Sequence, residues 1–169
     1  MRSLDVRARC GCRPGLAVLD GGAAGVGPDE LVSWARAVSD RSGAAFTSRS
    51  YRFPYALVAW HCEPVGVDVE RDDGYPAGFV NAVCTPTERA TYDQRAPDDA
   101  ELTALWSGKE ALAKALGDAV AYDPRRLESP LHWPEGRAQS WRAEQVRMPL
   151  GYSAWICWRE PAGVEVRSA

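Results

Sequence analysis

The sequence predicts an α+β fold in which a helix is followed by antiparallel strands in each half of the chain. In the first half, residues 29–40 carry apolar side chains at helical spacing, and strands are expected within residues 44–62. In the second half, a helix at about 98–117 precedes strand-like segments within residues 125–167. A length of 169 residues suits one compact domain or two small, closely packed halves.

The composition favours a soluble globular protein over a nucleic-acid-binding or membrane protein. The net charge is -3 and 46% of the residues are hydrophobic, which is typical of a soluble globular protein and argues against electrostatic binding of nucleic acid. The first nine residues contain charges throughout, and no run of about 18 apolar residues occurs. We therefore expect a cytoplasmic protein that binds neither nucleic acid nor membranes.

Cysteine and histidine are poorly placed for metal or nucleophilic chemistry. The five cysteines form no CxxC pair, and His61 and His132 are the only histidines. This pattern predicts reduced structural thiols rather than a zinc site. It also argues against a Ser-His-Asp or Cys-His catalytic group.

The first half begins with a glycine-rich stretch. We interpret residues 10–30 as a connector, because glycine recurs there without an apolar period. The helix that follows runs from Asp29 to about Asp40, with Leu31, Trp34, Ala35 and Val38 on its buried face. Strands are expected at 44–48 and 55–62.

A strand with alternating polarity follows Pro64. In residues 65–70 the valines face one way, while Gly66, Asp68 and Glu70 face the other. The two carboxylates are roughly 6.5–7 Å apart along the strand. They are either ordinary charges on an exposed face or the oxygen ligands of a hard cation such as Mg²⁺. Gly66 indicates close approach by a ligand or by another backbone.

Two shorter helices are expected next. The first spans residues 75–83, and the second begins with Thr85 as N-cap, Pro86 at the first helical position and Glu88 three residues after the cap. Glu88 completes a capping box, so its carboxylate is explained either as a cap or as a catalytic group.

The longest predicted helix runs from about Asp98 to Leu116 and ends at Gly117. Along one flank lie Trp106, Glu110 and Lys114, at spacings of four residues. Glu110 and Lys114 form either a surface ion pair or part of a site. The chain has 20 Lys and Arg residues, and this helix carries its only lysines, Lys109 and Lys114, which indicates a site suited to compact ammonium groups. Strands are expected beyond it at 125–129, 138–147, 152–158 and 164–167.

Three motifs together resemble the 4′-phosphopantetheinyl transferase superfamily. They are Gly66-Val-Asp-Val-Glu70, Thr85-Pro-Thr-Glu88 and Trp106-Ser-Gly-Lys-Glu-Ala-Leu-Ala-Lys-Ala-Leu-Gly117. The resemblance covers about residues 45–160 and is stronger to the surfactin-synthetase-type branch, because about 65 residues precede the first motif. It implies two pseudo-symmetric lobes, each with a helix on a small antiparallel sheet: a shortened N-terminal lobe (1–64) and a C-terminal lobe (65–169) with the metal and phosphate motifs.

The resemblance also implies a reaction. In this family the 4′-phosphopantetheine arm of coenzyme A is transferred to a serine of an acyl, peptidyl or aryl carrier protein, with Mg²⁺, and adenosine 3′,5′-bisphosphate is released. Asp68, Glu70 and Glu110 match the metal-binding carboxylates, and Lys114 matches a phosphate-contacting lysine. Lys109 also matches a position of the family motif. The resemblance implies that it contacts coenzyme A, with a less defined role than that of Lys114. Glu88 matches a glutamate suspected of activating the serine.

One departure from the family concerns coenzyme A. The surfactin-type enzymes carry a Ser-His-Ser segment that contacts the 3′-phosphate, and here Arg49 or Tyr51 takes the place of the histidine. Arg49, flanked by Ser48 and Ser50 and helped by Arg52, is the candidate phosphate ligand. The alternative function is a repurposed family member that binds a carrier protein or its pantetheine arm, in a biosynthetic pathway, without transferring it. A monomer is expected, and seven tryptophans make a homodimer conceivable.

Overall fold

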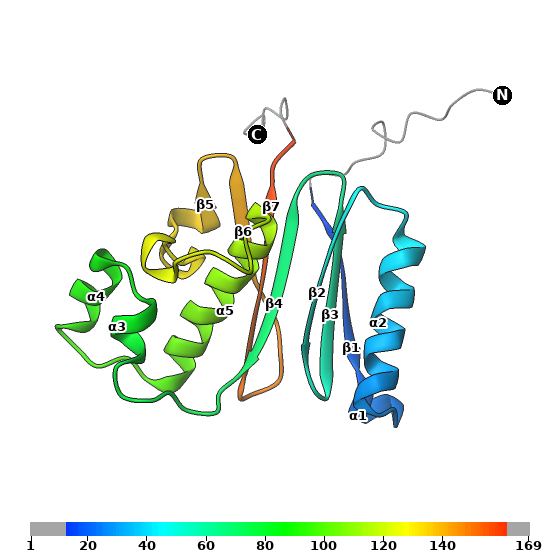
Figure 1. The fold of residues 1–169 in the computed structure, drawn as a ribbon, viewed down its shortest axis with the longest axis horizontal. Helices are drawn as coiled ribbons and strands as arrows, with labels where there is room; N and C mark the ends of the chain where they lie inside the picture. The colour runs from blue at the N-terminus through cyan, green and yellow to red at the C-terminus, as the bar shows by residue number, and fades with distance from the viewer. Residues whose placement is uncertain (1–12, 162–169) are drawn as a thin grey trace.

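Two antiparallel sheets and the helices on their outer faces make up residues 13–161, the part of the chain that the computed structural model describes (Figure 1). The first sheet contains β1 (Gly15–Asp20), β2 (Phe46–Arg52) and β3 (Tyr55–His61), in the order β1-β3-β2. Helices α1 (Gly21–Ala24) and α2 (Pro28–Ser42) connect β1 to β2. The predicted α+β class is confirmed, because each sheet is antiparallel and carries a helix.

The second sheet has the order β4-β7-β6-β5. Its strands are β4 (Val65–Arg71), β5 (Arg137–Ala138), β6 (Trp141–Val146) and β7 (Tyr152–Arg159). Between β4 and β5 lie α3 (Phe79–Val83), α4 (Pro86–Tyr92), α5 (Asp99–Leu116) and the 3₁₀ helices η2 (Pro124–Arg126), η3 (Pro130–His132) and η4 (Pro134–Gly136). Within residues 13–161, none of the helices has the length and apolar character needed to cross a lipid bilayer.

The two halves repeat one topology. In the first, strand β1 is followed by helix α2 and then by β2 and β3, with the last strand, β3, between the other two. In the second, β4 is followed by α5 and then by β6 and β7, with β7 between β4 and β6. Both central strands are antiparallel to their neighbours, so the pseudo-symmetry extends to strand direction.

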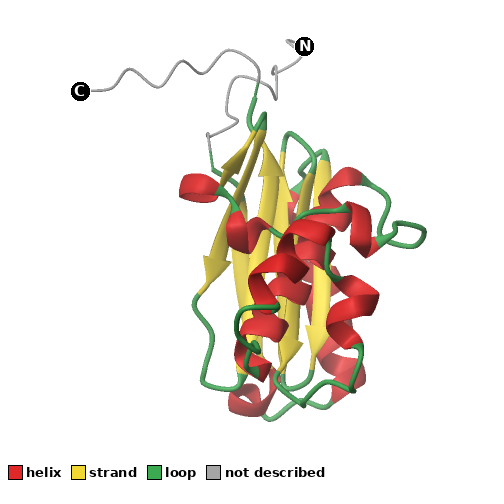
Figure 2. Ribbon diagram, turned by 90° about the vertical axis from the view of Figure 1, so that its left-hand side faces the viewer, coloured by secondary structure: helices red, strands yellow, loops and turns green. Residues whose placement is uncertain are grey.

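The core forms where the inner faces of the two sheets meet. The valine face of β4 packs there with the inner residues of β3 and β7, namely Leu57, Ala59, Val65, Val67, Val69, Ala154, Ile156 and Trp158. On the outer faces, α2 packs on β3 and α5 packs on β7. Figure 2 shows helices covering the strands from the α5 side. Because strand residues alternate between faces, Gly66, Asp68 and Glu70 face α5 instead of the core between the sheets.

Gly66 is the point where α5 crosses β4. A Cβ atom at this position would lie 2.0 Å from the Ala111 carbonyl oxygen and 2.5 Å from the Ala115 amide nitrogen. The close approach predicted at this glycine is therefore made by the backbone of a helix. The contact sets the distance between the strand that carries Asp68 and the helix that carries Glu110.

Replacing Gly66 with alanine is expected to destabilise the protein by about 1–3 kcal/mol, because a helix backbone must move to admit the methyl group. The free energy of unfolding, measured in urea, checks this. Because the shift also moves Glu110 relative to Asp68, cation binding by the folded variant should weaken as well. A variant as stable as the unchanged protein would contradict the described packing.

Several expected elements differ from the observed ones. Residues 15–24 form β1 and α1 in place of a connector. Gly15, one of the glycines that suggested a connector, has a packing role, since a Cβ there would lie 2.1 Å from the Trp60 ring. The helix expected over 75–83 is limited to α3, and the first strand of the predicted pair extends to Arg52.

The segment after α5 differs most from expectation. The strand predicted at 125–129 is wrong: proline starts a 3₁₀ helix at residue 124 and another at residue 130. The strand predicted at 164–167 lies outside the described residues. Cys84 and Cys157 are free and buried, as expected of structural thiols, whereas Cys62 is disulfide-bonded, so the prediction of reduced thiols is wrong for that residue.

Candidate active site

Asp68 stands at the centre of a polar cluster between β4 and α5. Its side chain is 5% exposed, and its Oδ1 accepts hydrogen bonds from Lys114 Nζ (2.7 Å) and Ser50 Oγ (2.8 Å). Lys114 also donates to the Val67 carbonyl oxygen at 3.2 Å. The lysine therefore spans from the helix to the strand and neutralises a buried carboxylate, which does not agree with the alternative of an exposed strand face.

Glu110 lies one helical turn before Lys114, yet Lys114 forms its ion pair with Asp68. The carboxylate of Glu110 instead accepts a 2.6 Å hydrogen bond from the Tyr122 hydroxyl. Burial raises the pKa of Glu110, the Tyr122 hydrogen bond lowers it, and the nearby Asp68 charge raises it further. Two carboxylates thus lie close enough to repel each other, with one lysine beside them.

Alternate side chains of β2 line the edge of β4. Ser48 Oγ accepts a hydrogen bond from the Val67 amide (3.1 Å), and Ser50 Oγ accepts one from the Val69 amide (3.2 Å). Arg52 forms an ion pair with Glu70. Hydroxyl groups thereby satisfy backbone donors at a sheet edge that would otherwise be unpaired. In this structure Ser48, Ser50 and Arg52, all predicted to bind coenzyme A, hold β4.

Arg49 and Tyr51 lie on the other face of β2. They are paired in register with Val58 and Ala56, which belong to the core beneath α2. Because directly paired residues of an antiparallel sheet share a face, the two candidates for the histidine position extend toward the α2 side. The structure does not bring Arg49 together with Asp68, Glu110 and Lys114.

Lys109 and Glu88 form a buried ion pair away from this cluster. Their side chains are 0% and 1% exposed, and Nζ lies 2.6 Å from Glu88 Oε2. The ammonium also donates to the carbonyl oxygens of Val83 (2.7 Å) and Pro124 (2.8 Å), which uses its three protons. Lys109 thus ties α5 to the end of α3 and to η2, and its ammonium does not face the polar cluster.

The second carboxylate oxygen of Glu88 is used too. Oε1 accepts a hydrogen bond from the Ser129 amide at 2.7 Å, and Oε2 accepts one from the Thr85 amide at 2.8 Å. The Thr85–Glu88 capping box predicted from sequence is confirmed. Of the two explanations left open for Glu88, the geometry favours the cap.

A cation site is incomplete in this arrangement. Within residues 13–161, no three His, Cys, Asp or Glu side chains lie close enough together to hold a metal ion. Asp68 and Glu110 are near each other, but Glu70 is engaged by Arg52. Even so, Oδ2 of Asp68 is buried and accepts no hydrogen bond from any described residue. An orphaned buried carboxylate oxygen beside a second carboxylate fits a hard cation.

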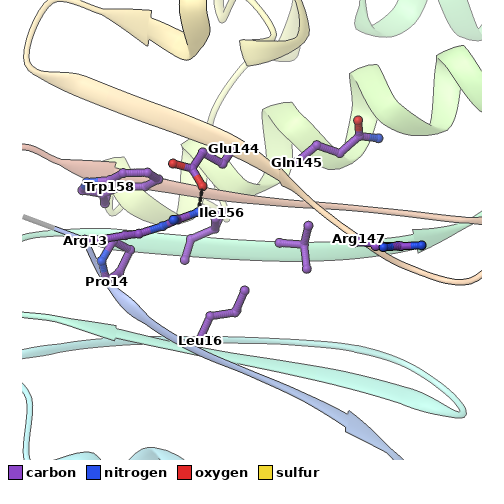
Figure 3. A pocket seen from close by; sticks show the side chains of 9 residues that line it. Arg13, Pro14, Leu16, Glu144, Gln145, Arg147, Ile156 and Trp158 are labelled. Atoms are coloured by element: carbon purple, nitrogen blue, oxygen red, sulfur yellow. Dashed lines mark hydrogen bonds and ion pairs between the residues drawn. The ribbon is translucent and has the colours of Figure 1, made fainter.

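Two pockets lie outside the cluster. One, of about 350 Å³, adjoins the end of β4 and the first turns of α5, where Asp72, Thr103 and Ser153 are among its lining residues. The other, of about 200 Å³, lies between β1 and β6, where Arg13 forms an ion pair with Glu144 across the two sheets (Figure 3). None of the predicted site residues lines either pocket.

Sequence reasoning missed three residues that shape the site. Ser107 Oγ donates to the carbonyl oxygens of Asp68 and Ser153, both at 3.3 Å. The other two residues lie in the irregular segment after α5. The Tyr122 hydroxyl donates a hydrogen bond to Glu110, and the Ser129 amide donates one to Glu88. That segment has no period, so no local pattern indicates which side chain turns inward.

Comparison with known proteins supports the motif assignment. A family model described as the 4′-phosphopantetheinyl transferase superfamily matches residues 64–155, more than half of the chain. The matched segment contains the strand of Asp68, the α4 capping box and the whole of α5. A search of curated proteins gives no match. Because the family model matches more than half of the chain and the match includes both β4 and α5, the chain belongs to the 4′-phosphopantetheinyl transferase superfamily.

Proposed function

We propose that this protein transfers the 4′-phosphopantetheine arm of coenzyme A to a serine of an acyl or peptidyl carrier protein, with Mg²⁺, and releases adenosine 3′,5′-bisphosphate. The observation that carries the proposal is the packing of β4 on α5, which places Lys114 on Asp68 and brings Glu110 close to it. Carboxylates with an adjacent ammonium group provide both signs of charge that a metal-bound pyrophosphate requires.

Lys114 is the proposed phosphate ligand. Its ammonium is 2.7 Å from Asp68 Oδ1, and its side chain is 23% exposed, so it is accessible to a bound molecule. A phosphoryl group that accumulates negative charge during in-line displacement is stabilised by a fixed ammonium nearby. The serine hydroxyl forms the new P–O bond, the bond to the adenosine-side phosphate breaks, and the serine proton passes to a base.

Asp68 and Glu110 would hold Mg²⁺, joined by Glu70. When bound there, Mg²⁺ would offset the charge of the pyrophosphate and polarise its P–O bond. The orphaned Oδ2 of Asp68 and the half-buried Glu110 supply oxygen donors for this role. Arg52 pairs with Oε2 of Glu70, so Oε1 is the Glu70 oxygen proposed for this role.

The other proposed roles have weaker support. Glu88 as base, and Lys109 as a coenzyme ligand, stay predictions, and the burial of both groups counts against direct contact with substrate. Arg49, with Ser48, Ser50 and Arg52, stays a proposed contact of the 3′-phosphate. We also propose the surfactin-type branch, lobes at 1–64 and 65–169, a cytoplasmic location, a monomeric state and a biosynthetic carrier protein as partner.

The proposal predicts a covalent product. The protein, coenzyme A and Mg²⁺ are incubated with a panel of apo carrier proteins, and each carrier is weighed by mass spectrometry. We expect the phosphopantetheine mass increment on at least one carrier, and its loss when the carrier serine is replaced by alanine or when EDTA is added. The transferase proposal fails if no carrier gains the increment while binding to a carrier is measurable.

Binding to a carrier without the mass increment would instead indicate the second candidate function. In that case the protein is a family member that binds a carrier protein or its pantetheine arm without transferring it. The observation in its favour is the engagement of Glu70 by Arg52, together with Arg49 or Tyr51 in place of the expected histidine. Binding of holo carrier more tightly than apo carrier, without transfer, would support this candidate.

A further inference from the structure

Tyr122 provides a contact to the candidate metal site that the motifs do not indicate. Its hydroxyl donates a 2.6 Å hydrogen bond to Oε1 of Glu110. The side chain is partly buried, whereas residues 117–121 just before it are exposed. One residue of an otherwise solvent-facing segment thus turns inward onto a carboxylate of the site.

The helix that carries Glu110 also fixes the segment that carries Tyr122. At the start, Gly117 ends α5 with a φ of 80°, and the Asp118 amide donates to the Ala113 carbonyl oxygen at 3.0 Å. At the far end, buried Lys109 donates to the Pro124 carbonyl oxygen at 2.8 Å. Because both ends are tied to α5, the Tyr122 hydroxyl is held at a set position relative to Glu110.

We propose that Tyr122 is a positioning residue that orients the Glu110 carboxylate for a divalent cation, an inference that rests on the proposed function. Within residues 13–161, Oε1 is the Glu110 oxygen for which a hydrogen bond is found, so Oε2 stays available as a ligand. A carboxylate that binds a metal is ordinarily held by such an outer partner, and losing the partner weakens metal affinity about 10–100-fold.

The chemistry of the partner suits this role. A phenol donates one hydrogen bond without adding positive charge, so it orients Glu110 and does not repel a cation. Asp68 is held differently, because the ammonium group of Lys114 compensates its negative charge. The phenol also removes rotational freedom from a glutamate that would otherwise lose it on binding the cation.

The test replaces Tyr122 with phenylalanine and measures Mn²⁺ binding to the full-length protein from the electron paramagnetic resonance signal of free Mn²⁺. Neither coenzyme A nor a carrier protein is present. We expect the Mn²⁺ dissociation constant of Tyr122→Phe to rise about 10–100-fold, with the thermal midpoint of unfolding unchanged. In the transfer assay, lost activity should return at high Mg²⁺, which a folding defect would not allow.

Tyr75→Phe is the matched control. Tyr75 lies on the same flank of α5 and donates to Thr103 Oγ1 at 3.2 Å, so the change removes an equivalent hydroxyl from a residue that is not a proposed ligand. This variant should bind Mn²⁺ as the unchanged protein does. If Tyr122→Phe binds Mn²⁺ as tightly as the unchanged protein does, the inference about Tyr122 is overturned while the proposed metal site stands. The same holds if Tyr75→Phe weakens Mn²⁺ binding as much as Tyr122→Phe does. Absence of Mn²⁺ binding by the unchanged protein would overturn the proposed metal site together with the inference.

Discussion

Glu110→Gln is expected to lower the rate of phosphopantetheine transfer by about 10²–10³-fold or more, because it removes charge from the site where a metal-bound pyrophosphate is proposed to react. The glutamine keeps the shape of the side chain and an oxygen that can accept the 2.6 Å hydrogen bond from Tyr122. The loss would therefore report on charge. Initial rates on an apo carrier protein, at saturating coenzyme A and Mg²⁺, give the measurement.

The same change should not destabilise the fold at neutral pH. Burial raises the pKa of Glu110, so its ionised form opposes folding, and this unfavourable contribution develops as the pH rises through the unfolded and folded pKa values. Neutral glutamine lacks that contribution. A thermal midpoint equal to or above that of the unchanged protein is expected at pH 7, and the difference between the two proteins should shrink as the pH is lowered.

Glu88→Gln serves as the comparison for activity. Glu88 is buried and bonded to Lys109, Thr85 and Ser129, so its replacement is expected to slow transfer without abolishing it. Equal and complete loss in both variants would refute this ranking and would return Glu88 to the role of base.

Lys109→Met is expected to lower the free energy of unfolding by about 3–5 kcal/mol, because it leaves the Glu88 carboxylate charged, buried and without its partner. The pair is 0% and 1% exposed, so water does not replace the lost ammonium. For a chain of this length, the midpoint of thermal unfolding should fall by roughly 6–20 °C. Urea unfolding followed by tryptophan fluorescence measures the free energy.

The double variant Lys109→Met with Glu88→Gln is the control for this prediction. It removes both charges, so it should be more stable than Lys109→Met alone. The carbonyl oxygens of Val83 and Pro124 still lose a donor in both variants, and some destabilisation should persist. A Lys109→Met protein as stable as the unchanged one would show that this ion pair does not hold α5 in place.

Local sequence patterns were sufficient for most helices and for the motif strand. Proline and threonine at residues 86 and 85 identified the start of α4, and Asp98 and Gly117 identified the ends of α5, because caps are determined by a few adjacent residues. Alternation in residues 65–70 correctly assigned the valines and the carboxylates to opposite faces of β4. β1 was missed because Gly15, which packs against Trp60, stands in a glycine-rich stretch that looks like a connector.

What the sequence by itself determined was the α+β class and, through three spaced motifs, membership of the transferase superfamily. Only the tertiary structure decided which charges meet. Glu110 and Lys114 are four residues apart on one helix, yet Lys114 is bonded to Asp68 and Glu110 to Tyr122. The reason is physical: spacing along a helix sets which side chains share a flank, whereas burial selects the partner that best compensates a desolvated charge. The ion-pair partners of Asp68, Glu70 and Glu88 come from distant segments, and no local pattern encodes those contacts.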